Sequence, residues 1–154
     1  MTTLVGTQKD FKDAIIALIE LEYDAIGAYK SAIEKLENAD FKENMTRFLK
    51  DHEQHLTRLK NFYTILEPSL KLPDKPDLIK GIMVKMKVSI GNAVGSDFSI
   101  LAAMLDNELD TNTAYQRITI HTGAPEGIDA ILTEAYNDEK RHKAWLEETL
   151  AEPY

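Results

Sequence analysis

Residues 138–147 read Asp-Glu-Lys-Arg-His-Lys-Ala-Trp-Leu-Glu, a run without glycine or proline that predicts uninterrupted helix. On a helix, residues three apart face the same way, with Cβ atoms about 5–6 Å from each other. Glu139 and His142 therefore form an i, i+3 pair that is suited to binding one metal ion. Such a pair needs further ligands from other helices, and the rest of the sequence supplies them.

The composition fits a single globular domain over residues 1–154, with 44% hydrophobic and 29% charged residues. The chain has no cysteine, which excludes disulfides, thiolate metal sites and thiol nucleophiles. A net charge of −8 disfavours nucleic acid and anionic membranes as partners, and it favours cations. Because no leader pattern or membrane-spanning run is evident, we expect a cytoplasmic protein.

Hydrophobic residues that recur at steps of three and four predict four helices, at about 10–38, 41–67, 97–121 and 125–150. Asp10 offers a cap for the first helix, and Asp40, in a capping-box pattern, offers one for the second. Ser96 is expected to cap the third helix, which Gly123 should end. Pro125 then suits the first turn of the last helix.

The links within each pair of helices are short, so the first and second helices, and the third and fourth, should lie antiparallel. About thirty residues from Pro68 to Ser96 are enough to carry the chain along the length of a bundle. An amphipathic stretch at 77–90 is expected to form a short helix in this crossover. The sequence therefore predicts an all-α, up-down-down-up four-helix bundle.

The two predicted hairpins look like copies of each other. Each presents one carboxylate on its first helix and an i, i+3 pair on its second. The first hairpin offers Glu22 with His52 and His55, and the second offers Glu108 with Glu139 and His142.

A lone Glu-x-x-His usually lies on a solvated face. Here, however, all six residues occupy positions where helix packing expects an apolar side chain, and no lysine or arginine shares those positions. Burying unpaired carboxylates costs several kcal/mol, so either these acids are protonated or a multivalent cation lies among them. A metal is the more economical explanation, because it satisfies the acids and the imidazoles together. Oxygen and imidazole ligands without sulfur suit iron or manganese, and zinc less decisively.

The run at 138–147 resembles the last-helix motif of bacterioferritin, Asp-Glu-x-x-His-x-x-Trp-Leu-Glu. Glu22 with Ala25, Ile26 and Tyr29 resembles the first-helix motif of bacterioferritin and of rubrerythrin, and the segment 108–110 is similar to the third-helix ligand region. The resemblance implies a ferritin-like di-iron protein that oxidises Fe(II) or reduces dioxygen or peroxide. It also implies that homodimers are a common assembly.

The same resemblance implies a role for each residue. Glu22 and Glu108 would be terminal carboxylates and Glu139 a bridging one, while His55 and His142 would each supply an imidazole to one of two iron ions. Tyr29 and Tyr115 would hydrogen-bond the ligands or lend an electron. The alternative for both tyrosines is an ordinary core position with a hydrated hydroxyl.

The sequence departs from the family pattern at His52, which stands where the family has a bridging glutamate. Three outcomes are open: Glu139 bridges alone, the neighbouring Glu53 takes part, or only one ion is held well. Glu53 also stands where the family has its haem-binding methionine, so we expect no haem. Two other functions remain open: a binding module that a metal only staples together, and an oxygenase acting on an organic substrate.

Overall fold

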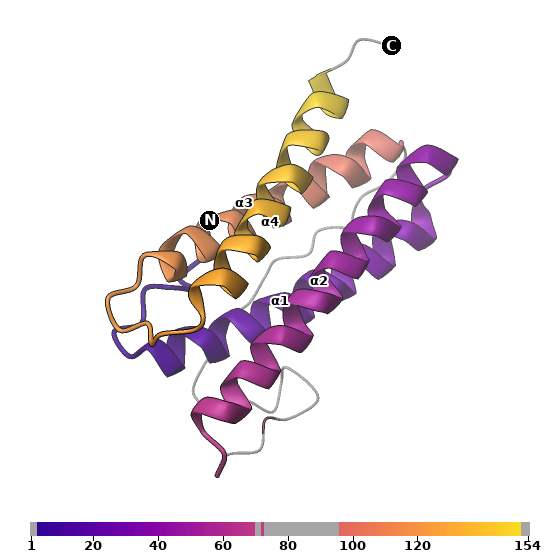
Figure 1. Ribbon diagram of the computed structural model, residues 1–154. Coiled ribbons are helices and arrows are strands. Elements are labelled where there is room, and N and C mark those ends of the chain that lie inside the picture. Colours follow the sequence, from indigo (N-terminus) through magenta and orange to yellow (C-terminus); the bar gives the residue numbers. More distant parts are fainter. Residues whose placement is uncertain (1–2, 70–71, 73–95, 152–154) are drawn as a thin grey trace.

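The structure is a computed structural model that describes residues 3–69, 72 and 96–151 (Figure 1). These residues contain four helices and no strand, which confirms the all-α bundle. The helices are α1 (Phe11–Lys35), α2 (Ala39–Leu66), α3 (Asp97–Thr119) and α4 (Asp129–Ala151). The short helix expected at 77–90 lies outside the described residues.

The four helices form two hairpins that pack face to face. α1 packs against α2 and α3 against α4, while α1 also contacts α3 and α2 contacts α4 (Figure 1). The Asp97 carboxylate at the start of α3 accepts hydrogen bonds from the backbone N–H groups of Glu37 and Asn38, at 3.0 and 2.8 Å. α2 and α3 therefore begin at the same end of the bundle, which gives the up-down-down-up order.

The starts of α1 and α2 show how side chains fix the helix ends. Asp10 caps α1 as expected, since its carboxylate accepts a hydrogen bond from the Lys12 N–H at 2.8 Å. The prediction that Asp40 caps α2 is wrong. Asn38 is the N-cap, and its Oδ1 accepts from the Phe41 N–H at 3.0 Å, so α2 begins two residues earlier than expected.

The two helices of the second hairpin are shorter than the sequence predicted. α3 starts after Ser96 but ends at Thr119, before Gly123 is reached. The prediction that Pro125 lies in the first turn of the last helix is wrong, because α4 begins at Asp129. Gly127 lies between Pro125 and Asp129, and its φ of 95° is a backbone conformation that a right-handed helix does not contain.

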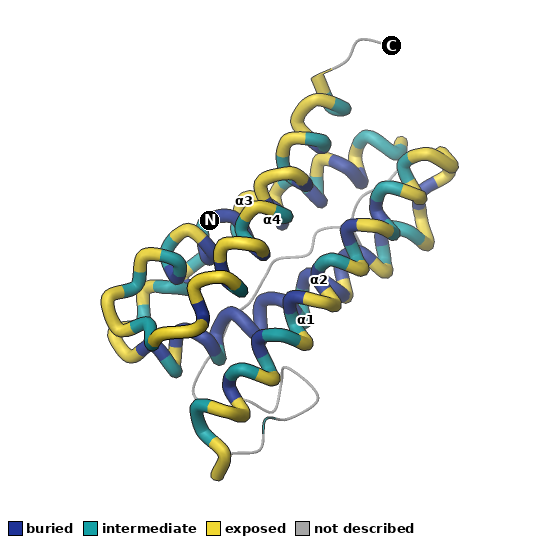
Figure 2. Tube along the Cα trace, viewed as in Figure 1, coloured by how far each residue is buried: buried dark blue, intermediate teal, exposed yellow. Residues whose placement is uncertain are grey.

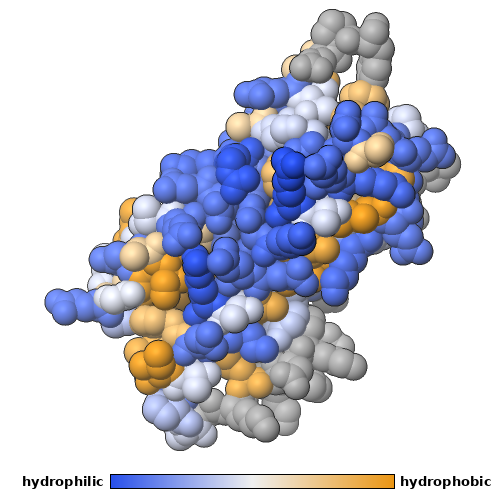
Figure 3. Space-filling model, turned by 45° about the vertical axis from the view of Figure 1, so that its right-hand side comes forward, coloured by the Kyte–Doolittle hydropathy of each residue, from blue (hydrophilic) through white to orange (hydrophobic). Residues whose placement is uncertain are grey.

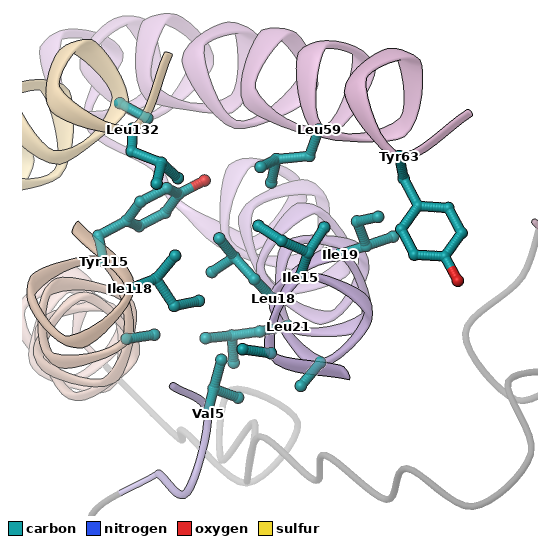
Figure 4. Close-up of a cluster of buried hydrophobic side chains, with 14 of the residues drawn as sticks. Val5, Ile15, Leu18, Ile19, Leu21, Leu59, Tyr63, Tyr115, Ile118 and Leu132 are labelled. Carbon is teal, nitrogen blue, oxygen red and sulfur yellow. The ribbon is translucent and has the colours of Figure 1, made fainter. Parts of the chain in front are cut away.

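The hydrophobic core consists of two clusters along the bundle axis. One contains Ile15, Leu18 and Leu59, with Ile118 and Leu132 from the other hairpin (Figure 4). The second is built from Leu36, Met45, Phe48, Leu101, Met104 and Leu146. Buried residues follow the inward sides of all four helices (Figure 2). Between the two clusters, the inward positions carry polar side chains, and these form the candidate centre.

The face of the molecule in Figure 3 is mostly hydrophilic, with a few hydrophobic patches, in keeping with the many charged residues. Among the described helices, none is both long enough and apolar enough to cross a membrane.

Candidate metal centre

Each helix contributes inward polar side chains to the layer between the two hydrophobic clusters. Six of these side chains are 0–1% exposed, and they are the six that the sequence singled out: Glu22, His52, His55, Glu108, Glu139 and His142. On every helix, the three-and-four spacing of the hydrophobic residues continues through these positions, so the packing that buries leucine and phenylalanine also buries the acids and imidazoles. Their role as metal ligands stays a prediction.

The six side chains divide into two overlapping groups, in each of which one ligand atom per residue lies within 4.8 Å of the others. Donors bonded to one ion at about 2.1 Å lie up to about 4.2 Å apart, so the spread of each group is close to that of a single coordination sphere. His52 and Glu139 belong to both groups. The first group adds Glu22 and His55, and the second adds Glu108 and His142.

His52 lies at the middle of the centre. Its Nδ1 is 3.0 Å from Glu22 Oε2 and 3.3 Å from Glu139 Oε1, whereas its Nε2 is 3.0 Å from Glu108 Oε1. One imidazole thus faces a carboxylate of each hairpin. Glu53, the alternative from sequence, is exposed on α2 and lies outside both groups.

His55 and His142 are each oriented by an aspartate of the opposite hairpin. His55 Nε2 lies 2.9 Å from Asp138 Oδ2, and His142 Nε2 lies 2.8 Å from Asp51 Oδ2. Because a carboxylate only accepts, each Nε2 carries the hydrogen, and this leaves the Nδ1 lone pair of a neutral imidazole directed into the centre. Arg141 contacts both aspartates, at 3.0 and 2.9 Å.

The sequence reasoning missed this outer layer. Asp51 and Asp138 each directly precede the first residue of an i, i+3 pair, so the internal repeat contained the signal. They lie one residue away from the inward positions and are about a quarter exposed, at 25% and 22% for their side chains. A search restricted to the inward positions therefore passes over them.

Three buried atoms directed into the centre make no hydrogen bond within the described part of the chain. They are His55 Nδ1, His142 Nδ1 and Glu139 Oε1. His55 Nδ1 is 3.2 Å from Glu139 Oε1, and His142 Nδ1 is 3.4 Å from Glu108 Oε1. Buried polar atoms are normally paired, and these three are the donor types that bind iron, manganese or zinc. The residues present therefore fit a metal.

The charges of the centre also fit two divalent ions. With neutral imidazoles, the three central glutamates and the two aspartates carry five negative charges, of which Arg141 offsets one. The remaining charge of −4 is the charge that two divalent cations neutralise.

Without a metal, the imidazoles are the groups that balance the central acids. Although burial opposes it, His52 and His55 lower the pKa of Glu22 to about 2. The pKa of His55 is in turn raised to about 10 by Glu139 and Glu22, against the effect of burial. Burial and the neighbouring Glu108 raise the pKa of Glu139 to about 7. The three acids thus cannot all ionise at low cost, which a bound cation would change.

Both candidate tyrosines contact the centre, in a crossed arrangement. Tyr29 of α1 donates its hydroxyl hydrogen to Glu108 of α3, and Tyr115 of α3 donates to Glu22 Oε1 of α1 at 3.3 Å. Burial first, and then the carboxylate that each hydroxyl faces, raise the pKa of both phenols well above the usual value. Each tyrosine therefore stays neutral and acts as a hydrogen-bond donor to a carboxylate across the bundle.

Two residues of α3 that the sequence analysis did not single out tie this helix to α4. The Thr111 hydroxyl lies 2.8 Å from Glu139 Oε2 and 3.2 Å from Glu108 Oε2. Asn112 Nδ2 lies 2.7 Å from the Glu108 carbonyl oxygen and 3.0 Å from the Glu139 carbonyl oxygen. These contacts fix Glu108 and Glu139 relative to each other.

Fold and centre together define an all-α four-helix bundle whose core holds a buried group of histidines and glutamates able to bind metal ions. The chain belongs to the family described as "Domain of unknown function (DUF2383)", which matches residues 10–120. That segment contains α1, α2 and α3 with four of the six central residues, while α4 lies beyond it. No curated protein and no solved structure matches the chain.

Proposed function

We propose that this protein is a ferritin-like bundle that binds two divalent metal ions, iron foremost, and uses them in the oxidation of Fe(II) by dioxygen or peroxide. The observation that carries the proposal is the convergence of three buried atoms that make no hydrogen bond within the described residues, namely His55 Nδ1, His142 Nδ1 and Glu139 Oε1. The resemblance of 138–147 to the bacterioferritin motif supports iron in particular.

The proposed assignment gives one ion to each overlapping group. Glu22 and His55 hold one ion, Glu108 and His142 hold the other, and Glu139 lies between them. Two ferrous ions supply two electrons, which matches the reduction of dioxygen to peroxide or of peroxide to water. The two hydrophobic clusters lie on either side of this buried layer.

The remaining side chains would orient the ligands. The Asp138 and Asp51 carboxylates hold the two outer imidazoles with Nδ1 inward. The Tyr29 hydroxyl donates to one oxygen of Glu108, and the Tyr115 hydroxyl donates to one oxygen of Glu22. The second carboxylate oxygen of each glutamate accepts no hydrogen bond from that tyrosine. A single folded domain, the cytoplasm and a homodimer remain our expectations for this protein.

The test is Fe(II) binding and oxidation by chelator-treated protein. Fe(II) added without oxygen should bind to a limit of two per chain, and air or peroxide should then give a ferric absorbance that rises faster than in buffer. Glu139→Ala should abolish this acceleration. Glu53→Ala, which removes an exposed carboxylate from the same region, is the matched control and should leave it unchanged. Equal rates with and without the protein would refute the oxidase function.

A second function is favoured by His52 in particular. An imidazole that contacts glutamates of both hairpins through its two nitrogens ties the hairpins together, whereas a bridging carboxylate would also couple two iron ions electronically. The alternative is therefore a helical module that a metal staples together without redox chemistry. Retention of Zn(II) through purification, a raised melting temperature and no Fe(II) oxidation would favour this alternative.

A further inference from the structure

The two halves of the centre differ at one position of the repeat. Thr111 follows Glu108 by three residues, and the residue that follows Glu22 by three is Ala25. Both are buried, but only Thr111 brings a hydroxyl group, which lies 2.8 Å from Glu139 Oε2. Ala25 has only a methyl side chain, so it brings no hydroxyl group to the half that contains Glu22.

This difference acts on Glu139, which both halves share. Oε2 accepts the hydrogen bond from Thr111, whereas Oε1 makes no hydrogen bond in the described residues. Oε1 lies 3.2 Å from His55 Nδ1, while Oε2 is 3.9 Å from His142 Nδ1. The oxygen left free by Thr111 therefore faces the half that contains His55.

His52 presents one ring nitrogen to each half. A neutral imidazole has one N–H and one lone pair, so it can ligate only one of two ions. Its Nδ1 lies 3.0 Å from Glu22 Oε2 and its Nε2 lies 3.0 Å from Glu108 Oε1, so the ring faces one carboxylate of each half at the same distance. The difference between the halves therefore comes from Thr111 and Glu139, and His52 is counted with neither position.

We propose that the two metal positions are unequal and fill in a fixed order, and that Thr111 is the positioning residue that sets the order. The first position consists of Glu22, His55 and Glu139. The second consists of Glu108 and His142. Two carboxylates attract a divalent ion more strongly than one, so the first position binds more tightly. This inference rests on the proposed function only in that the centre binds two ions.

The test uses Co(II), whose visible absorption reports its ligands, with chelator-treated protein in the absence of oxygen. The wild-type protein should bind Co(II) in two steps, with dissociation constants about 10–100-fold apart, the usual effect of hydrogen bonds to metal ligands. Thr111→Val keeps the shape of the side chain and removes the hydroxyl, so the two dissociation constants should become more nearly equal. Thr111→Ser keeps the hydroxyl and should restore the gap, which a role in packing alone would not do.

The order of filling has its own measurement, which does not depend on Thr111 variants folding. His55→Ala should abolish the tight step, and His142→Ala should abolish only the weak one. Two equal Co(II) sites in the wild-type protein, loss of the tight step in His142→Ala, or an unchanged gap in Thr111→Val would each overturn the inference. Two equal sites would leave the proposed function standing, whereas no Co(II) binding at all would remove both.

Discussion

Replacing Glu139 by glutamine should stabilise the metal-free protein at neutral and alkaline pH, although it removes a proposed ligand. Burial raises the pKa of Glu139 from 4.5 to about 7. At about 1.4 kcal/mol per pH unit, this difference corresponds to about 3 kcal/mol of unfolding free energy. Glutamine has nearly the same shape as the protonated acid and does not ionise.

The raised pKa of Glu139 determines whether the folded state gains or loses stability as the pH rises. Below pH 4.5 the carboxyl is protonated in both the folded and unfolded states, so Glu139 adds no pH dependence there. As the pH rises through 4.5 to about 7, the unfolded chain loses the proton more readily than the folded chain, and the folded state loses stability. At pH 8, Glu139→Gln should therefore be more stable than the wild-type protein by about 3 kcal/mol, and the difference should vanish near pH 4.

Urea unfolding followed by far-ultraviolet circular dichroism, with a chelator present and at several pH values, measures this difference. Glu53→Gln makes the same chemical change on the surface and should alter stability by less than about 0.5 kcal/mol at every pH. Adding Mn(II) should reverse the ranking, because only the wild-type protein keeps the full ligand set. A Glu139→Gln protein that is less stable than the wild-type protein at pH 8 without metal would refute the reasoning.

Two further predictions concern the outer aspartates and the helix caps. Asp138→Asn and Asp51→Asn should each lower the affinity of one metal position by about 10–100-fold in Co(II) binding, and unchanged affinities would contradict the orienting role of the aspartates. Asn38→Ala should cost about 1 kcal/mol in urea unfolding, since the Asn38 side chain caps α2, whereas Ser96→Ala should cost much less because Ser96 makes no side-chain cap bond. Equal losses in the two alanine variants would count against this account.

The sequence predicted the four helices and the central layer because both depend on the same local regularity. Residues three and four apart share a helix face, and a face that buries Leu18 or Leu59 also buries Glu22 or His55. Helix ends depend on single backbone conformations instead. The positive φ of Gly127 is incompatible with a right-handed helix, so α4 begins only at Asp129, and the sequence does not reveal that φ.

The contacts around the centre could not be predicted in the same way. Which carboxylate each imidazole meets depends on how far one helix is shifted along another, and a single helix does not encode that shift. The sequence shows that Tyr29 lies on the same helix as Glu22, but it does not show which carboxylate the hydroxyl meets, and in the structure this is Glu108 of α3. The hydrogen bond from Thr111 to Glu139 likewise depends on the register between α3 and α4.

The crossed arrangement of the centre has a consequence for how the protein assembles. His55 of the first hairpin is oriented by Asp138 of the second, and His142 of the second is oriented by Asp51 of the first. Neither hairpin by itself can orient its own outer imidazole, however well its own helices form. If the centre binds metal as proposed, a retained ion would report that the two halves have docked in register, and a slip of one helical turn between them would abolish metal retention while leaving the helix content intact.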